Sequence, residues 1–254
     1  MKKFFALAAI FAATMISFTA CEEDKPVGPG PDETPADVCE ECGKNPCECE
    51  EDYVSPITID GDFADWAGLD ASKVSVATCN ADAKWTALKT VKVYCDDVYL
   101  NVYFEFDADE IADLSSVPFH VYINEDASAA TGNDQFLGQG GQDWLMEGFV
   151  FSEGAFCSYD PYLFDYTGAE DTVEWAYEEI LPGDSGIGSG AGAGNAYEFS
   201  LMREMLMGVN LADTFTIGFD IQQSWNSVGV LPNTAISDDN ANGSVEMLVV
   251  NVAK

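Results

Sequence analysis

The residues best suited to binding an ion lie in VYINEDASAATGNDQF, residues 121 to 136, where polar side chains follow an alternating apolar run. Carboxylate and amide oxygens are the ligands that calcium prefers in proteins. Asn124, Asp126 and Asp134 therefore form a predicted calcium site, which would hold the loop in place rather than take part in a reaction. The segment is not an EF-hand, because counting from Asn124 it lacks both the glycine and the final glutamate which that loop requires. The alternative is a solvated turn.

Recognition of a sugar would need flat aromatic faces beside amides or carboxylates. The sequence offers six candidates for this role, three tryptophans and three residues on one face of a predicted strand: Trp85, Trp144, Trp225, Tyr99, Asn101 and Tyr103. Trp85 lies in a polar stretch, between Lys84 and Thr86, and is expected to be the most exposed tryptophan. A glycan is therefore the predicted ligand.

Signatures of catalysis are lacking. The sequence contains no serine-nucleophile motif and no HExxH, and His120 is its only histidine. A glycosidase would need two carboxyl groups at a defined separation, one of them with a raised pKa. With 45 acidic residues, such a pair could be picked only arbitrarily. The protein is therefore predicted not to be an enzyme.

The N-terminus has the pattern of an export signal. Lys2 and Lys3 precede an apolar run, and small residues lead to Cys21, so residues 1 to 20 are predicted to be a signal peptide. SFTAC resembles a bacterial lipobox, with Phe18 where leucine is typical, and this resemblance implies a diacylglycerol on Cys21. The following CEEDK resembles the surface-export signal of Bacteroidetes lipoproteins; a plain solvated tether is the alternative. The expected location is the outer membrane, with the lipid as the only membrane contact.

Residues 21 to 52 are predicted to form a disordered acidic tether, since they are rich in acids and prolines and poor in large apolar residues. The tether contains four closely spaced cysteines: Cys39, Cys42, Cys47 and Cys49. Four thiolates could bind zinc, whereas an exported protein would favour two short-range disulfides. We expect disulfides, and zinc is the alternative.

Charge excludes one class of partner. The chain has 45 acidic residues against 10 lysines and arginines, a formal net charge of −35. No lysine or arginine occurs between Lys92 and Arg203. Such a surface repels phosphate backbones, so nucleic acid is not an expected partner.

Residues 53 to 254 are predicted to form one all-β domain, a two-sheet antiparallel β-sandwich of jelly-roll type. The segment TVKVYCDDVYLNVYFEFD predicts a hairpin, whose second run turns one face to the core and the other to water or a ligand. Residues 117 to 124 and 213 to 225 show the same alternation. Further strands are expected at 56–60, 74–79, 144–151, 172–178, 197–201 and 245–252. A short helix is expected at 200–208 with Ser200 as its N-cap, and a flexible loop at 183–195.

Four motifs in order resemble the family 9 carbohydrate-binding modules and their DOMON-like relatives. They are ITIDGDFADWAGL, LKTVKVYCDDVYLNVYFE, VYINEDASAATGNDQF with QDWLMEG, and SWNSVGVLPN. The resemblance spans about residues 56 to 250 and implies a jelly-roll sandwich, often stabilised by calcium. Some DOMON relatives hold haem between a methionine and a histidine, so haem at His120 with Met146 or Met247 is one alternative.

The expected function is that of a lipid-anchored, surface-exposed, non-catalytic carbohydrate-binding protein. The alternative is a structural or interaction protein of the cell envelope that binds no sugar.

Overall fold

The structure is a computed structural model that describes residues 53–134, 136, 140–169, 173–206, 211–241, 243 and 246–254. Within them, residues 54 to 254 belong to one compact unit. The expected signal peptide, the lipidated Cys21, the tether and its four cysteines lie outside the described residues.

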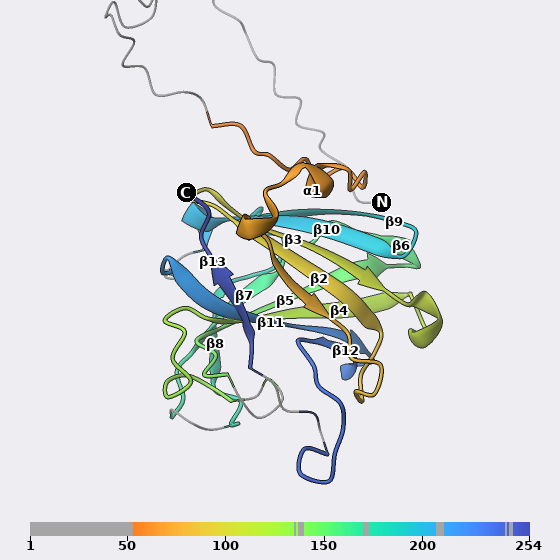
Figure 1. Ribbon diagram of the computed structural model, residues 1–254, viewed down its shortest axis with the longest axis vertical. Helices are drawn as coiled ribbons and strands as arrows, with labels where there is room; N and C mark the ends of the chain where they lie inside the picture. The colour runs from red at the N-terminus through yellow and green to blue at the C-terminus, as the bar shows by residue number, and fades with distance from the viewer. Residues whose placement is uncertain are drawn as a thin grey trace, which may run out of the picture. The chain divides into compact units, whose positions relative to one another are not determined.

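Two antiparallel sheets pack face to face as a β-sandwich, which confirms the predicted fold class (Figure 1). The first sheet has five strands in the order β1 (Ser75–Thr78), β2 (Leu88–Cys95), β3 (Tyr99–Phe106), β10 (Ala196–Met202) and β9 (Gly188–Ala193). The second has the order β12 (Asn226–Leu231), β11 (Thr214–Gln223), β4 (Ser116–Asn124), β5 (Trp144–Ser152), β7 (Tyr162–Tyr166) and β8 (Tyr177–Leu181). It also includes β13 (Leu248–Asn251), which pairs with β11, and β6 (Ala155–Phe156), which pairs with β5.

Helical structure in the described residues is short. It comprises the α-helix α1 (Asp65–Gly68) and the 3₁₀ turns η1 (Ala71–Lys73), η2 (Ala108–Glu110) and η3 (Arg203–Met205). None of the described helices is long and apolar enough to cross a membrane.

Aromatic residues on the inner faces hold the two sheets together. Phe104 of β3 stacks on Phe119 of β4, with ring centroids 4.5 Å apart and planes within 8°. Phe119 in turn packs edge-on against Phe199 of β10. The predicted inner face of the second hairpin strand is confirmed, because Leu100 and Val102 are fully buried beside Phe104. The alternation of apolar side chains therefore placed this face correctly.

A buried carboxylate fastens the segment before β1 to the outer face of the five-stranded sheet. Glu198 of β10 accepts hydrogen bonds from the backbone N–H groups of Asp60 and Gly61 and from Trp66 Nε1, the last at 2.9 Å. The Trp66 ring packs 5.7 Å from that of Tyr103. Figure 1 shows α1, which carries Trp66, lying beside β3 and β10. This contact explains why the expected strand at 56–60 is wrong, since backbone N–H groups here bind a side chain instead of a neighbouring strand.

The expected loop at 183–195 is also wrong, because it contains β9. Its glycines let the strand run against aromatic rings: a Cβ at Gly190 would lie 2.0 Å from the Tyr197 hydroxyl, and one at Gly192 would lie 2.4 Å from the Phe156 ring. The glycines suggested a flexible loop, but in the structure they let the β9 backbone lie close to aromatic side chains.

Two other expectations about local structure need correction. Ser200 lies inside β10 rather than at a helix start, so the expected helix at 200–208 is reduced to η3. Of the strand expected at 172–178, residues 173 to 176 are not strand, and β8 begins only at Tyr177. At Ser200 the pairing of β10 with β3 and β9 overrides the local helical signal.

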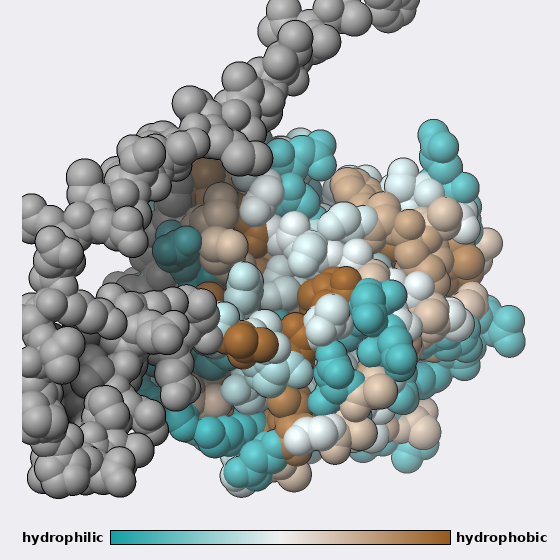
Figure 2. Space-filling model, turned by 90° about the horizontal axis from the view of Figure 1, so that it is seen from above, coloured by the Kyte–Doolittle hydropathy of each residue, from teal (hydrophilic) through white to brown (hydrophobic). Residues whose placement is uncertain are grey.

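Figure 2 shows one face of the molecule. On its coloured part, small groups of hydrophobic residues alternate with polar ones. That part carries no single continuous apolar surface. This is the usual pattern for a water-facing surface.

Glu198→Ala should destabilise the domain by about 3 kcal/mol, because it leaves three buried or half-buried N–H donors without their acceptor. Urea unfolding measures this. Glu204→Ala, an exposed glutamate in η3, is the matched control and should change the free energy of unfolding by less than about 0.5 kcal/mol. Equal unfolding midpoints for the two variants would show that Glu198 does not fasten the segment.

Candidate functional site

Trp225 stands at a tight turn on the eight-stranded sheet. Ser224 and Trp225 are the two residues between β11 and β12, and both have positive φ, 49° and 63°. A two-residue hairpin of this kind is normally made by Asn-Gly, because left-handed backbone is costly for other residues. The Trp225 side chain is nevertheless 57% exposed. A bulky aromatic residue in a strained, exposed position is a candidate for contact with another molecule.

Beside Trp225 lies a buried polar group of side chains on the outer face of β4, β5, β11 and β12. The His120 ring is 6.2 Å from the Trp225 ring, between centroids. His120 Nε2 is 3.1 Å from a carboxylate oxygen of Glu147, without the alignment of a hydrogen bond. On the other side, His120 Nδ1 is 3.3 Å from Gln222 Nε2. These side chains meet because His120 is paired across the sheet with both Glu147 of β5 and Asp220 of β11.

Asp220 lies under this group and is almost fully buried. Its Oδ2 accepts hydrogen bonds from Gln222 Nε2 and the Ser227 hydroxyl, both at 2.7 Å, whereas Oδ1 has no partner. Burial raises the pKa of Asp220 to about 6, although the two hydrogen bonds and His120 act in the opposite direction. Burial therefore disfavours the ionised form of this carboxyl group.

A groove of about 300 Å³ begins at Glu147 and continues along β5 and β7. Its walls combine aromatic rings with carboxylates: Phe149, Tyr162, Glu147, Asp160 and Asp184. Phe149 also packs edge-on against Trp225 at 6.0 Å, so the groove is continuous with the exposed tryptophan. Together these residues offer flat aromatic faces beside hydrogen-bond acceptors.

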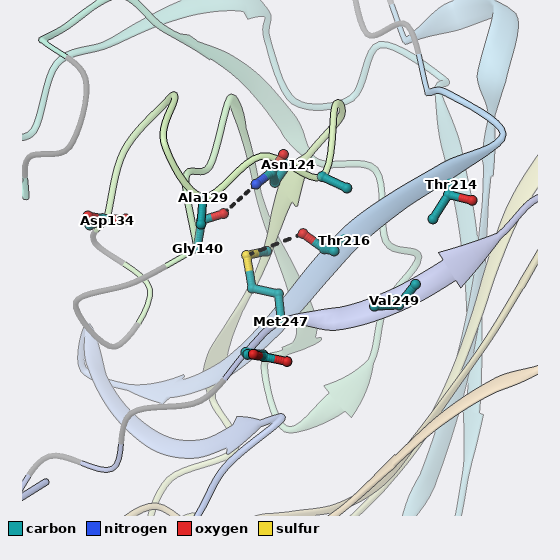
Figure 3. Close-up of a pocket in the computed structure, with 10 residues that line it drawn as sticks. Asn124, Ala129, Asp134, Gly140, Thr214, Thr216, Met247 and Val249 are labelled. Carbon is teal, nitrogen blue, oxygen red and sulfur yellow. Dashed lines mark hydrogen bonds between the residues drawn. The ribbon is translucent and has the colours of Figure 1, made fainter.

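A second cavity, of about 480 Å³, lies between the loop that follows β4, which carries Ala127 and Asp134, and strands β11 and β13 (Figure 3). Asn124, at the end of β4, donates to the Gly140 carbonyl at 2.6 Å, and Thr216 donates to the sulfur of Met247 at 3.9 Å. None of the described residues lining this cavity is aromatic. It therefore lacks the stacking surface that the Trp225 site offers.

The predicted calcium ligands are already engaged in the hydrogen bonds of their own loop. Asn124 Oδ1 and Asp126 Oδ1 both accept from the Ser128 N–H, and Asp134 Oδ1 accepts from the Gly141 N–H. Among the described residues, no group of three or more His, Cys, Asp or Glu side chains is placed to hold a metal. A calcium ion here would need the Asn124 amide or backbone carbonyls to complete its oxygen ligands.

Negative charge is concentrated at the same corner, which would suit a cation. Burial raises the pKa of Asp143 to about 6, and the charges of Asp126, Glu125 and Asp165 act in the same direction. The Asp143 carboxylate accepts the Glu125 N–H at 2.9 Å. Calcium at Asn124, Asp126 and Asp134 thus stays a prediction, and the structure adds Asp143 as a neighbouring carboxylate.

The predicted ligand residues do not come together. Tyr99, Asn101 and Tyr103 lie on the five-stranded sheet, and Asn101 and Tyr103 are buried there, so the expected open face on β3 is wrong. Trp144 is buried too, and its Nε1 donates to Glu125.

Trp85 is half-buried against a small apolar cluster, so it is not the most exposed tryptophan. Of the six candidates, Trp225 alone belongs to the site described above.

Glu147, Asp220 and Gln222 are not among the ligand residues predicted from the sequence. Each is a polar residue on the outer face of an alternating strand, which the sequence pattern presents as ordinary solvent exposure. The haem alternative is not favoured by the positions of its methionines. Met146 faces the inner core and Met247 contacts Gln142 and Thr216, while His120 adjoins Glu147.

Neither a protein-family model nor a curated protein matches this sequence.

The free energy of unfolding should fall less with rising pH in Asp220→Asn than in the wild-type protein. The folded state holds the Asp220 proton up to about pH 6, whereas the unfolded chain loses it near 3.8. This contribution is fully present below pH 3.8 and is lost as pH rises through 6. Relative to the Asn variant, the wild-type unfolding free energy should therefore fall by roughly 2 to 3 kcal/mol over this window.

Urea unfolding at several pH values measures the difference, with Glu204→Gln as a control expected to parallel the wild type. Parallel wild-type and Asp220→Asn curves would contradict the pKa assigned to Asp220.

Calcium should raise the melting temperature of the domain by several degrees, because an ion that binds only the folded state stabilises it. A chelator should reverse the rise, and Asp126→Asn with Asp134→Asn should abolish it. Asp238→Asn, at an exposed loop position, is the control. A melting temperature indifferent to calcium and chelator would leave the loop as a turn held by hydrogen bonds.

Proposed function

We propose that this protein is a non-catalytic carbohydrate-binding protein whose ligand lies on Trp225 and in the adjoining groove. The exposed Trp225 ring, held in left-handed backbone beside Phe149, carries the proposal. Sugar rings present C–H faces that stack on tryptophan, while their hydroxyls hydrogen-bond to carboxylates and amides. Glu147, which lines the groove, supplies such an acceptor.

Limited access to Asp220 supports a binding role over a catalytic one. A glycosidase needs two carboxyl groups that reach opposite sides of one glycosidic bond. Asp220 has only 4% of its surface exposed and points its bonded oxygen at Gln222 and Ser227. Glu147 is therefore the one member of this pair that a sugar in the groove could contact.

The same proposal includes the export route expected from the N-terminus. Cys21 carries the lipid that attaches the protein to the outer membrane, the tether holds the domain away from the membrane, and the domain faces outwards. The resemblance to family 9 modules and DOMON-like domains belongs to the proposal as well. Loss of membrane association and of palmitate labelling in Cys21→Ala tests the anchor, and protease treatment of intact cells tests exposure.

The alternative function is that of a structural or interaction protein of the cell envelope. It would use exposed Trp225 as a protein contact instead of a sugar platform. The groove favours a glycan, because its carboxylates and rings line a channel rather than a flat patch.

Trp225→Gly should abolish glycan binding while leaving the fold intact. Glycine relieves the left-handed backbone, worth about 1 to 2 kcal/mol, and this offsets the lost ring contacts. The free energy of unfolding should therefore stay within about 1 kcal/mol of the wild type. Calorimetry against a panel of plant, fungal and mucin glycans measures binding.

Trp175→Ala is the matched control, because Trp175 is 53% exposed and contacts Tyr177 rather than the groove. It should bind as the wild type does. If no glycan in the panel binds the wild-type protein, the carbohydrate proposal fails and the envelope-protein alternative takes its place.

A further inference from the structure

The charge of the groove points beyond sugars in general to one chemical class. Three of its lining residues are carboxylates, Glu147, Asp160 and Asp184, and none of its described lining residues is a lysine or arginine. The sequence explains this imbalance, since it has neither residue type between Lys92 and Arg203. The groove therefore has a strongly negative potential.

The three carboxylates are not equally available. Asp160 is committed to the turn beside it, because its oxygens accept the N–H groups of Gly186 and Ile187 at 2.7 and 3.0 Å. Asp184 stands exposed at the rim. Glu147 is the innermost, with one oxygen 3.1 Å from His120 and its side chain 20% exposed to the groove.

A buried acceptor without a partner lies across His120 from Glu147. Asp220, paired across the sheet with His120, keeps its Oδ1 unbonded although the residue is almost fully buried. When ionised, this carboxylate adds to the negative potential of this part of the sheet.

Aromatic faces border the same point. Phe149 lines the groove with Glu147, and Trp225 packs against Phe149 and against His120, which adjoins Glu147. A tryptophan face attracts cations through its ring quadrupole. Carboxylate acceptors next to such rings suit an ammonium group, which offers three hydrogen-bond donors and a positive charge. They disfavour a carboxylated or sulfated sugar, which would bring like charges together.

We infer that the groove selects glycans carrying a protonated primary amine, with the ammonium group on Glu147 and beside Trp225. This rests on the proposed carbohydrate-binding function and names the ligand class for the same site. De-N-acetylated hexosamine chains have this chemistry, whereas their N-acetylated counterparts present a neutral amide at the same carbon.

The test compares oligosaccharides of one length by calorimetry at a pH that keeps the amines protonated. The ligands are the β-1,4-glucosamine tetramer, its fully N-acetylated form, cellotetraose and a tetramer of galacturonic acid. The amine tetramer should bind about tenfold more tightly than either neutral tetramer, which is the effect of one good charge-assisted hydrogen bond. The uronate should not bind.

Glu147→Gln should remove this preference, and Asp184→Asn should reduce it less, because Asp184 lies at the rim. Glu204→Gln, in η3 outside the groove, should keep the full preference for the amine tetramer. This variant controls for the loss of one negative charge anywhere on the protein. Far-UV circular dichroism and the melting temperature establish that each variant is folded.

Each result separates the two proposals. A preference for amines that survives Glu147→Gln would come from the overall negative charge and would overturn the inference. Neutral tetramers that bind as well as the amine would also overturn it, while leaving carbohydrate binding in place. Absence of binding to all four ligands and to the wider panel would remove both.

Discussion

Burial of the central strands β4 and β11 on both faces constrains what the eight-stranded sheet can carry. Their inner faces pack into the aromatic core, where Phe119 stacks on Phe104. Their outer faces are also buried, yet they hold His120, Asp220 and Gln222. Buried polar groups are costly unless they bond to each other, so these three side chains must meet across the strand pairing. The polar group beside Trp225 follows from this constraint.

The shortage of basic residues determines which hydrogen-bond donors the buried carboxylates use. With no lysine or arginine between residues 92 and 203, buried acids there turn to backbone N–H groups. Glu198 accepts two of these and the Trp66 indole, Asp160 fixes the turn at 186–187, and Asp96 caps the β2–β3 hairpin through the Val98 and Tyr99 N–H groups. Many of the acids thus shape loops, and the groove keeps its negative charge because none of its described lining residues is a lysine or arginine.

Trp225 shows what the proposed binding role would cost this domain in stability. A two-residue turn with both φ values positive would be most stable with asparagine and glycine. The chain instead places serine and tryptophan there, and the ring packs against His120 and Phe149 while remaining largely exposed. Such a cost is usual where a side chain is held ready for a ligand.

The sequence alone determined the fold class and the inner faces of the strands. Alternation with a period of two identified the buried face of Leu100, Val102 and Phe104, and the turn at Asp96 located the hairpin. These features depend on neighbours along the chain, so local pattern suffices to predict them. The signal peptide, lipid anchor and tether rest on local pattern as well and stay predictions.

Only the tertiary structure decided which polar residues meet. Glu147 of β5 lies far in sequence from Asp220 and Gln222 of β11, and alternation alone could not distinguish their buried outer face from one open to water. The same limit explains the corrections at Asn101 and Tyr103, whose face is buried rather than open; Tyr103 packs against Trp66. It also explains β9, whose glycines are required by the aromatic rings they approach. Burial on the second face of a sheet depends on long-range packing, which no sequence period records.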